Sequence, residues 1–98
     1  MTIEIKKGAD ETRIELAGRL DTTTAPALDK TVNNDIQDAK NLILDLKGLE
    51  YISSAGLRVI LGAQKKMQKI GSMKVINVRE EVMEVFEMTG FADILTIE

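Results

Sequence analysis

Two adjacent serines, Ser53 and Ser54, are the side chains best placed for chemistry in this sequence. They follow a largely apolar stretch and stand directly before a segment whose apolar residues recur at helical spacing. A serine hydroxyl at such a position accepts a hydrogen bond from the first helical turn, and Ser54 is the natural N-cap. A phosphate on the same oxygen would meet free N–H donors and the positive end of the helix dipole. The pair is therefore interpreted either as a helix cap or as a phosphorylation site.

The composition excludes most catalytic uses of these hydroxyls. The chain has no cysteine and no histidine, which removes thiolate chemistry, the Ser-His-Asp triad and most transition-metal sites. With 13 Lys+Arg, 16 Asp+Glu, one Tyr and no Trp, it lacks the basic surface and stacking rings of nucleic-acid binding. A small hydrolase that uses Ser54 with a lysine such as Lys47 stays open as an alternative.

A second candidate site precedes the first expected helix, in the polar segment Gly18–Thr24. Its Asp21 is either a turn or capping carboxylate, or a group that faces a partner if the two loops are neighbours. Thr23 or Thr24 is expected to cap the helix that follows, with Pro26 in the first helical turn.

Gly56 is unusual because glycine is unfavourable inside a helical turn. One explanation is tight packing of the helix against the sheet. The other is that Ala55 and Gly56 keep the surface low, so that the backbone of another protein reaches a serine hydroxyl.

Hydrophobic periodicity predicts the elements that position these residues. Strands are expected at 2–6, 12–17, 42–46, 73–78 and 94–97, and helices at 25–39, 54–70 and 82–86, with Gly71 as a left-handed helix-terminating residue. The first two strands form a hairpin, and 42–46 is expected to be a central strand covered on both faces. The order β-β-α-β-α-β-α-β predicts an α/β fold with a mixed, mainly parallel sheet and helices packed on it.

Sites in such sheets tend to lie outside the carboxyl ends of the strands, which here selects the loops Gly18–Thr24 and Lys47–Ser54. A length of 98 residues argues for one domain. No apolar run approaches the roughly 18 residues of a membrane span, and the N-terminus alternates instead of building a signal-peptide block. We therefore expect a cytoplasmic protein without membrane insertion.

The sequence resembles the STAS domain of bacterial anti-sigma factor antagonists. The likeness rests on Leu42–Leu46, on Leu49–Leu57 with its Ser-Ser-Ala-Gly-Leu run, and on Val59–Leu61. It continues upstream to Gly18–Asp21 and downstream to Val85–Phe91, so that it covers essentially all of residues 1–98.

The resemblance implies a single STAS domain over residues 1–98 with no enzymatic activity and no cofactor of its own. The unphosphorylated form is expected to bind an anti-sigma factor that is also a serine kinase, which frees the sigma factor. Phosphorylation of Ser54 would end this binding, and a serine phosphatase would restore it. The implied partner surface comprises Asp21, Thr22, Thr24, Ser53, Ser54, Ala55, Gly56, Leu57 and Arg58.

One departure from the family concerns the residue before the phosphoserine. Many members carry aspartate there, whereas this chain has Ser53, which makes Ser53 the runner-up acceptor. A second alternative is that the same fold serves another assembly, such as a stressosome-like complex or a lipid-transport ATPase.

Overall fold

An N-terminal β-hairpin opens the fold, as the alternating sequence predicts. In the computed structural model, which describes residues 1–36 and 39–98, β1 (Thr2–Lys7) pairs antiparallel with β2 (Glu11–Leu20). β2 pairs in parallel with β3 (Asn41–Ile52), and β3 pairs in parallel with β4 (Ser72–Ile76). The strand order is therefore β1-β2-β3-β4, and the predicted mixed, mainly parallel sheet is confirmed.

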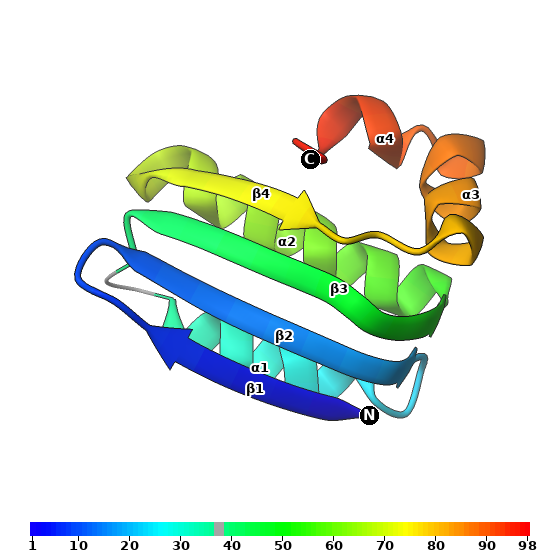
Figure 1. Ribbon diagram of the computed structural model, residues 1–98, viewed down its shortest axis with the longest axis horizontal. Helices are drawn as coiled ribbons and strands as arrows, with labels where there is room; N and C mark the ends of the chain where they lie inside the picture. The colour runs from blue at the N-terminus through cyan, green and yellow to red at the C-terminus, as the bar shows by residue number, and fades with distance from the viewer. Residues whose placement is uncertain (37–38) are drawn as a thin grey trace.

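Two helices cover one face of this sheet. Figure 1 shows α1 (Ala25–Asp35) and α2 (Ser54–Ile70) behind the strands, with α3 (Glu80–Thr89) and the short α4 (Phe91–Ile94) near β4. Their apolar residues meet those of the sheet in one core, which includes Leu28, Leu44, Ile60, Met67 and Phe86. Within the described residues, no helix is long and apolar enough to cross a membrane.

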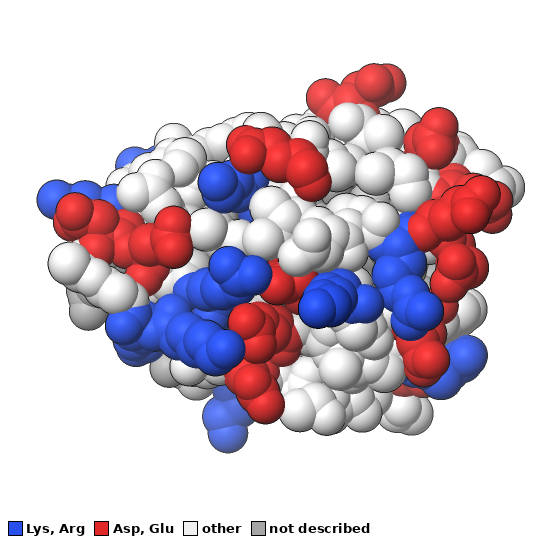
Figure 2. Space-filling model, in the orientation of Figure 1, with Lys and Arg blue, Asp and Glu red and all other residues white. Residues whose placement is uncertain are grey.

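Within the described residues, α1 and α2 lie on one face of the sheet only, so helices cover residues 42–46 on that face and not on the other (Figure 1). Figure 2 shows basic and acidic side chains interleaved on that other face. It holds a groove of about 600 Å³ whose lining includes Arg13, Asp45, Lys47 and Asn77. Residues 42–46 are nevertheless all buried, because β3 lies in the middle of the sheet.

Both predicted loops are shorter than expected because β2 and β3 continue pairing beyond the predicted ends. Two register shifts, between Glu15 and Ala17 and between Gly18 and Arg19, let the two strands stay together. Gly18 adopts a φ of 98°, which glycine tolerates, at the second shift. Gly48 looks like a turn residue in the sequence, but a Cβ there would lie 2.7 Å from the Ala17 Cβ. It permits close strand approach instead.

Three further element predictions need correction. Helix α1 ends at Asp35, and residues 37–38 of the predicted 25–39 helix lie outside the described residues. Gly71 is extended, with a φ of 175°, instead of left-handed; a Cβ there would lie 1.8 Å from the Lys40 carbonyl oxygen. The predicted strand 94–97 is reduced to a single parallel bridge between Ile97 and Val75, because α4 occupies residues up to Ile94.

Two glycines of α2 give a matched stability test. A Cβ on Gly56 would lie 2.6 Å from Leu20 Cγ, whereas a Cβ on Gly62 would meet nothing within 4 Å. We expect Gly56→Ala to destabilise the fold by roughly 1–3 kcal/mol through overpacking. Gly62→Ala should stabilise it by about 0.5–1 kcal/mol, because alanine is the better helix former. Urea unfolding measures both free energies, and changes of the same sign would contradict the packing described.

A buried carboxylate joins the strands on the open face. Asp45, which is 6% exposed, accepts hydrogen bonds from the Arg13 guanidinium at 2.5 Å, the Lys47 N–H at 3.0 Å and the Asn77 side chain at 3.1 Å. Burial by itself raises the pKa of the Asp45 carboxyl, but these donors outweigh it and lower that pKa below its ordinary value. The Asp45 side chain is therefore an ionised structural group at neutral pH.

This carboxylate predicts a sensitivity of folding to acid. Because the pKa of Asp45 is lowered in the folded state, its stabilising contribution is complete above the unfolded-state value near pH 4. The contribution is lost as the pH falls through the folded-state value. Unfolding free energies measured between pH 7 and pH 2 should decline more for the wild type than for Asp45→Asn, which is less stable at neutral pH. Parallel declines would show that Asp45 is not the acid-sensitive group.

Candidate functional site

The start of α2 determines the roles of the two serines, and it reverses the predicted cap. Ser53 has extended backbone angles, and its Oγ accepts a hydrogen bond from the Gly56 N–H at 3.4 Å. Ser53 is therefore the N-cap, and Ser54 is the first residue of the helix. The prediction of Ser54 as the cap was wrong by one residue because β3 runs through Ile52 and leaves only Ser53 between strand and helix.

This assignment also explains the departure from the family pattern at position 53. Aspartate and serine are about equally good N-caps, because each presents an oxygen to the first helical turn. Ser53 thus keeps the capping function that an aspartate would supply, while it is half-buried. Ser54 is exposed, and its side chain makes no hydrogen bond to any part of residues 1–36 or 39–98. The freely accessible hydroxyl is therefore that of Ser54.

Asp21 holds the turn that leads into α1, and neither Thr23 nor Thr24 caps this helix through its side chain. The Asp21 Oδ1 accepts hydrogen bonds from the Thr23 hydroxyl at 2.7 Å, the Thr23 N–H at 3.0 Å and the Thr24 N–H at 3.1 Å. Thr24 stands at the N-cap position of α1 but makes no capping bond; its hydroxyl donates instead to the Arg19 carbonyl at 2.8 Å. Pro26 lies in the first turn of α1, as predicted.

The two oxygens of Asp21 are differently occupied. The bond from the Thr23 hydroxyl is the main cause of a lowered pKa at Asp21, supported by the Thr23 and Thr24 N–H groups and only partly opposed by burial. The carboxylate is therefore charged at neutral pH. Oδ2 has a single close partner among the described residues, the Arg19 Nε at 4.0 Å, which is beyond hydrogen-bond distance. Oδ1 fixes the side chain, and Oδ2 remains available.

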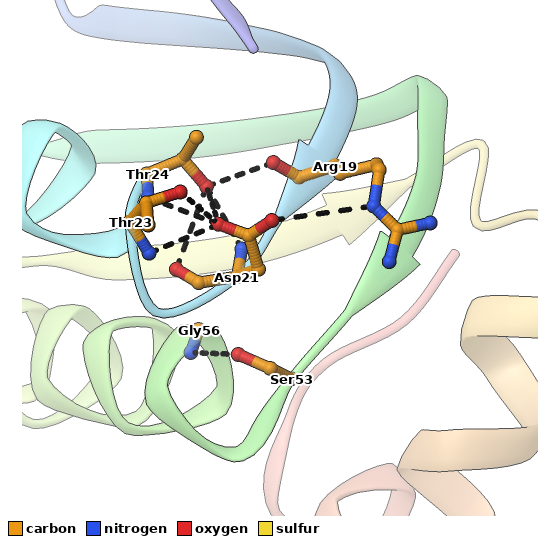
Figure 3. A network of polar contacts seen from close by, with 6 residues as sticks. All are labelled: Arg19, Asp21, Thr23, Thr24, Ser53 and Gly56. Atoms are coloured by element: carbon orange, nitrogen blue, oxygen red, sulfur yellow. Dashed lines mark hydrogen bonds and ion pairs between the residues drawn. The ribbon is translucent and has the colours of Figure 1, made fainter.

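The two candidate loops are neighbours in space. The Ser53 N–H donates to the Leu20 carbonyl at 2.9 Å, and Leu20 pairs with Ile52 in the parallel register. Figure 3 shows the Asp21 turn beside the first turn of α2, with Ser53 and Gly56 across from it. The carboxyl ends of β2 and β3 thus bring an anchored carboxylate and an exposed serine to one edge of the sheet, as expected for this architecture.

The remaining predicted surface residues divide into exposed and buried ones. Thr22 and Arg58 are exposed, and Ala55 is half-buried. Gly56 and Leu57 are buried, so they support the surface from below and are not part of it. Of the two explanations for Gly56, helix–sheet packing accounts for the residue, because a Cβ would collide with Leu20.

Two residues of this edge were missed by sequence reasoning. Arg19 and Tyr51 lie opposite each other in the β2–β3 register, and the guanidinium carbon stands 4.1 Å from the centre of the tyrosine ring. Both positions had been assigned to loops, so no pairing was expected. The sequence indicates this pairing only through an arginine and an aromatic residue near the ends of two strands. Whether the two residues face each other depends on the β2–β3 register.

The Ser–Lys alternative requires a lysine amine beside Ser54. Lys47 lines the groove on the open sheet face together with Asp45. It lies within β3, and the rest of that strand separates it from Ser54. No lysine amine hydrogen-bonds to Ser54 within residues 1–36 and 39–98. The geometry that this chemistry needs is therefore not formed in the described part of the chain.

Comparisons with known proteins agree with the fold and with the family that the sequence resembles. The family model of the STAS domain matches residues 1–98. The chain is 30% identical over 98 residues to the anti-sigma-B factor antagonist of Bacillus subtilis (strain 168), covering 99% of this chain and 90% of that protein.

Structures of the anti-sigma factor antagonist SpoIIAA are similar as well. The unphosphorylated form has a TM-score of 0.85 at 18% identity, covering 99% and 88% of the two chains. The phosphorylated form, from Bacillus, has a TM-score of 0.78 at 17% identity, covering 99% and 91%.

Proposed function

The chain belongs to the STAS domain family, and from this premise we propose that it acts as an anti-sigma factor antagonist controlled by phosphorylation of Ser54. The whole of residues 1–98 forms the domain in this proposal. The observation that carries it is the exposed Ser54 hydroxyl at the start of α2, whose first turn lies beside the turn that holds Asp21 (Figure 3). A relative over nearly the full length bears the name anti-sigma-B factor antagonist.

In the unphosphorylated state, the surface formed by the Asp21 turn and the start of α2 presents the fixed negative charge of Asp21. The small polar side chains of Thr22 and Ser54 are exposed on the same surface. Asp21 presents Oδ2 without further reorganisation because hydrogen bonds from Thr23 and Thr24 hold Oδ1. A cationic side chain of an anti-sigma factor would pair with this oxygen. Occupation of the anti-sigma factor by this chain would then free the sigma factor.

Phosphorylation would change the charge of this surface without requiring the helix to move. Within residues 1–36 and 39–98, no acceptor meets the N–H groups of Ser54 and Ala55, which are the free donors expected at a helix start. A phosphate on Ser54 adds a charge of about −1.5 to −2 beside these donors and near the ionised Asp21. A partner surface fitted to the smaller, less charged form would lose affinity, tenfold for each ~1.4 kcal/mol.

The partners follow from this cycle. The anti-sigma factor is also the serine kinase, so ATP and its metal ion belong to that protein, and this chain contributes only the acceptor hydroxyl. A separate serine phosphatase returns the chain to its binding form. No catalytic step is assigned to any residue of the chain.

A displacement experiment tests the proposal. The purified chain is added to preformed complexes of sigma factors with the kinase-type anti-sigma factors of the genome that encodes it. The unmodified chain should release the sigma factor from one of these complexes, and the chain carrying phosphoserine at position 54 should not. Release by both forms alike, or by neither, would contradict the proposed switch. Stable binding to other STAS proteins instead would favour a scaffold subunit.

A further inference from the structure

Arg19 and Tyr51 form an exposed stacked pair beside the proposed partner surface. The Arg19 side chain is 63% exposed and Tyr51 is 40% exposed, although the ring is large and apolar. The guanidinium carbon stands 4.1 Å from the ring centre, a cation–π geometry. Figure 3 shows the Arg19 side chain extending from β2 across the end of β3, with its Nε nearest to Asp21.

The pair contributes little to folding. An exposed cation–π contact is worth about 0.5–1 kcal/mol, and an exposed ion pair 4.0 Å apart contributes less than about 1 kcal/mol. Across residues 1–36 and 39–98, no hydrogen bond is made by the Arg19 guanidinium or by the Tyr51 hydroxyl. Arginine and tyrosine are among the residues that most often dominate binding energy at protein interfaces.

The stack also determines where the positive charge stands. Arg19 Nε remains 4.0 Å from Asp21 Oδ2, whereas a direct hydrogen bond would require about 2.7–3.2 Å. Stacking on Tyr51 holds the planar guanidinium beside the carboxylate while its terminal nitrogens stay available. Such a fork matches the two oxygens of a carboxylate.

We propose that Arg19 and Tyr51 are specificity determinants that select a partner carrying a carboxylate next to the cation accepted by Asp21. The inference rests on the proposed function, since it concerns the same surface. A partner that presents only a cation to Asp21 would be repelled by Arg19. A partner that presents a cation and a carboxylate side by side pairs with both Asp21 and Arg19. Partners without the carboxylate bind more weakly, because their cation is repelled by the Arg19 charge.

Charge reversal at Arg19 tests the inference against a matched control. The probe is the anti-sigma factor whose complex the unmodified chain disrupts in the displacement experiment. Arg19→Glu should weaken its binding by at least about tenfold, and Arg19→Gln by less. Tyr51→Ala should weaken binding, whereas Tyr51→Phe, which keeps the ring, should not. The control is Lys40→Glu, which reverses another exposed cation, 3.9 Å from Asp10 at the opposite end of the sheet, and should bind like the wild type.

Melting temperatures establish that each variant is folded before binding is compared. Reversal of the matching carboxylate of the anti-sigma factor to arginine should restore binding to Arg19→Glu. Wild-type affinity in Arg19→Glu, or tighter binding by Arg19→Gln, would overturn the inference and leave the proposed function standing. If the unmodified wild type disrupts no complex, the proposed function falls and the inference falls with it.

Discussion

Replacement of Ser54 by alanine is expected to abolish phosphate incorporation by the partner kinase, whereas Ser53→Ala should remain a substrate. The expectation follows from the positions of the two hydroxyls. Ser54 is exposed and makes no hydrogen bond within the described residues, while the Ser53 hydroxyl caps α2 by accepting from the Gly56 N–H. Transfer of a phosphoryl group needs an accessible hydroxyl, which only Ser54 provides without loss of the cap.

The two variants also separate phosphorylation from stability. Ser53→Ala should lower the free energy of unfolding by roughly 1 kcal/mol through loss of the cap, and Ser54→Ala should change it little. Both should bind the unphosphorylated-state partner within about threefold of the wild type, since neither carries the charged group of the surface. Phosphosite mapping by mass spectrometry after incubation with kinase and ATP gives the result. Full incorporation into Ser54→Ala would move the acceptor to Ser53 and refute the assignment.

A second large effect is expected for the charge of Asp21. Asp21→Asn keeps an Oδ1 acceptor for the Thr23 and Thr24 N–H groups but replaces the available Oδ2 with an uncharged NH₂ group. We expect binding to the anti-sigma factor to weaken by at least about tenfold, because the partner cation loses its counter-charge. The melting temperature should stay close to that of the wild type.

Asp21→Ala serves as the companion variant. It removes both oxygens, so it should lose the same affinity and, in addition, destabilise the turn before α1 by about 0.5–1.5 kcal/mol through the lost hydrogen bonds. Calorimetric titration of both variants against the unmodified partner distinguishes the two roles of the side chain. Equal affinities for wild type and Asp21→Asn would mean that Asp21 only holds the turn before α1.

The parts of the fold that the sequence predicts are those with strong local periodicity. The alternation of Ile3 and Ile5 and of Ile14 and Leu16 is enough for the hairpin, and the apolar spacing along 54–70 is enough for α2. The strand ends were missed because Gly48 has two physical uses, a turn or close strand approach, and only the neighbouring Ala17 decides between them. Local sequence contains no information on that neighbour.

The site shows the same division between local and non-local information. The candidate positions Asp21 and Ser54 could be selected from sequence, because the ends of parallel strands converge at one edge. Whether Ser53 or Ser54 caps α2 depends on where β3 ends, and a shift of that end by one residue changes the assignment. Arg19 and Tyr51 required the β2–β3 register, including its two shifts, and a register that shifts within a strand cannot be counted along the chain.

The stacked ring at the end of β3 gives the molecule an optical property. The chain has one tyrosine and no tryptophan, so its intrinsic near-ultraviolet emission comes almost entirely from Tyr51. That ring lies against a guanidinium and two residues before the cap of α2. Displacement of Arg19 or addition of charge to the helix start changes the surroundings of the only fluorophore. The intrinsic tyrosine fluorescence of the unlabelled protein should therefore change on phosphoryl transfer and on dephosphorylation, and it can be followed in real time.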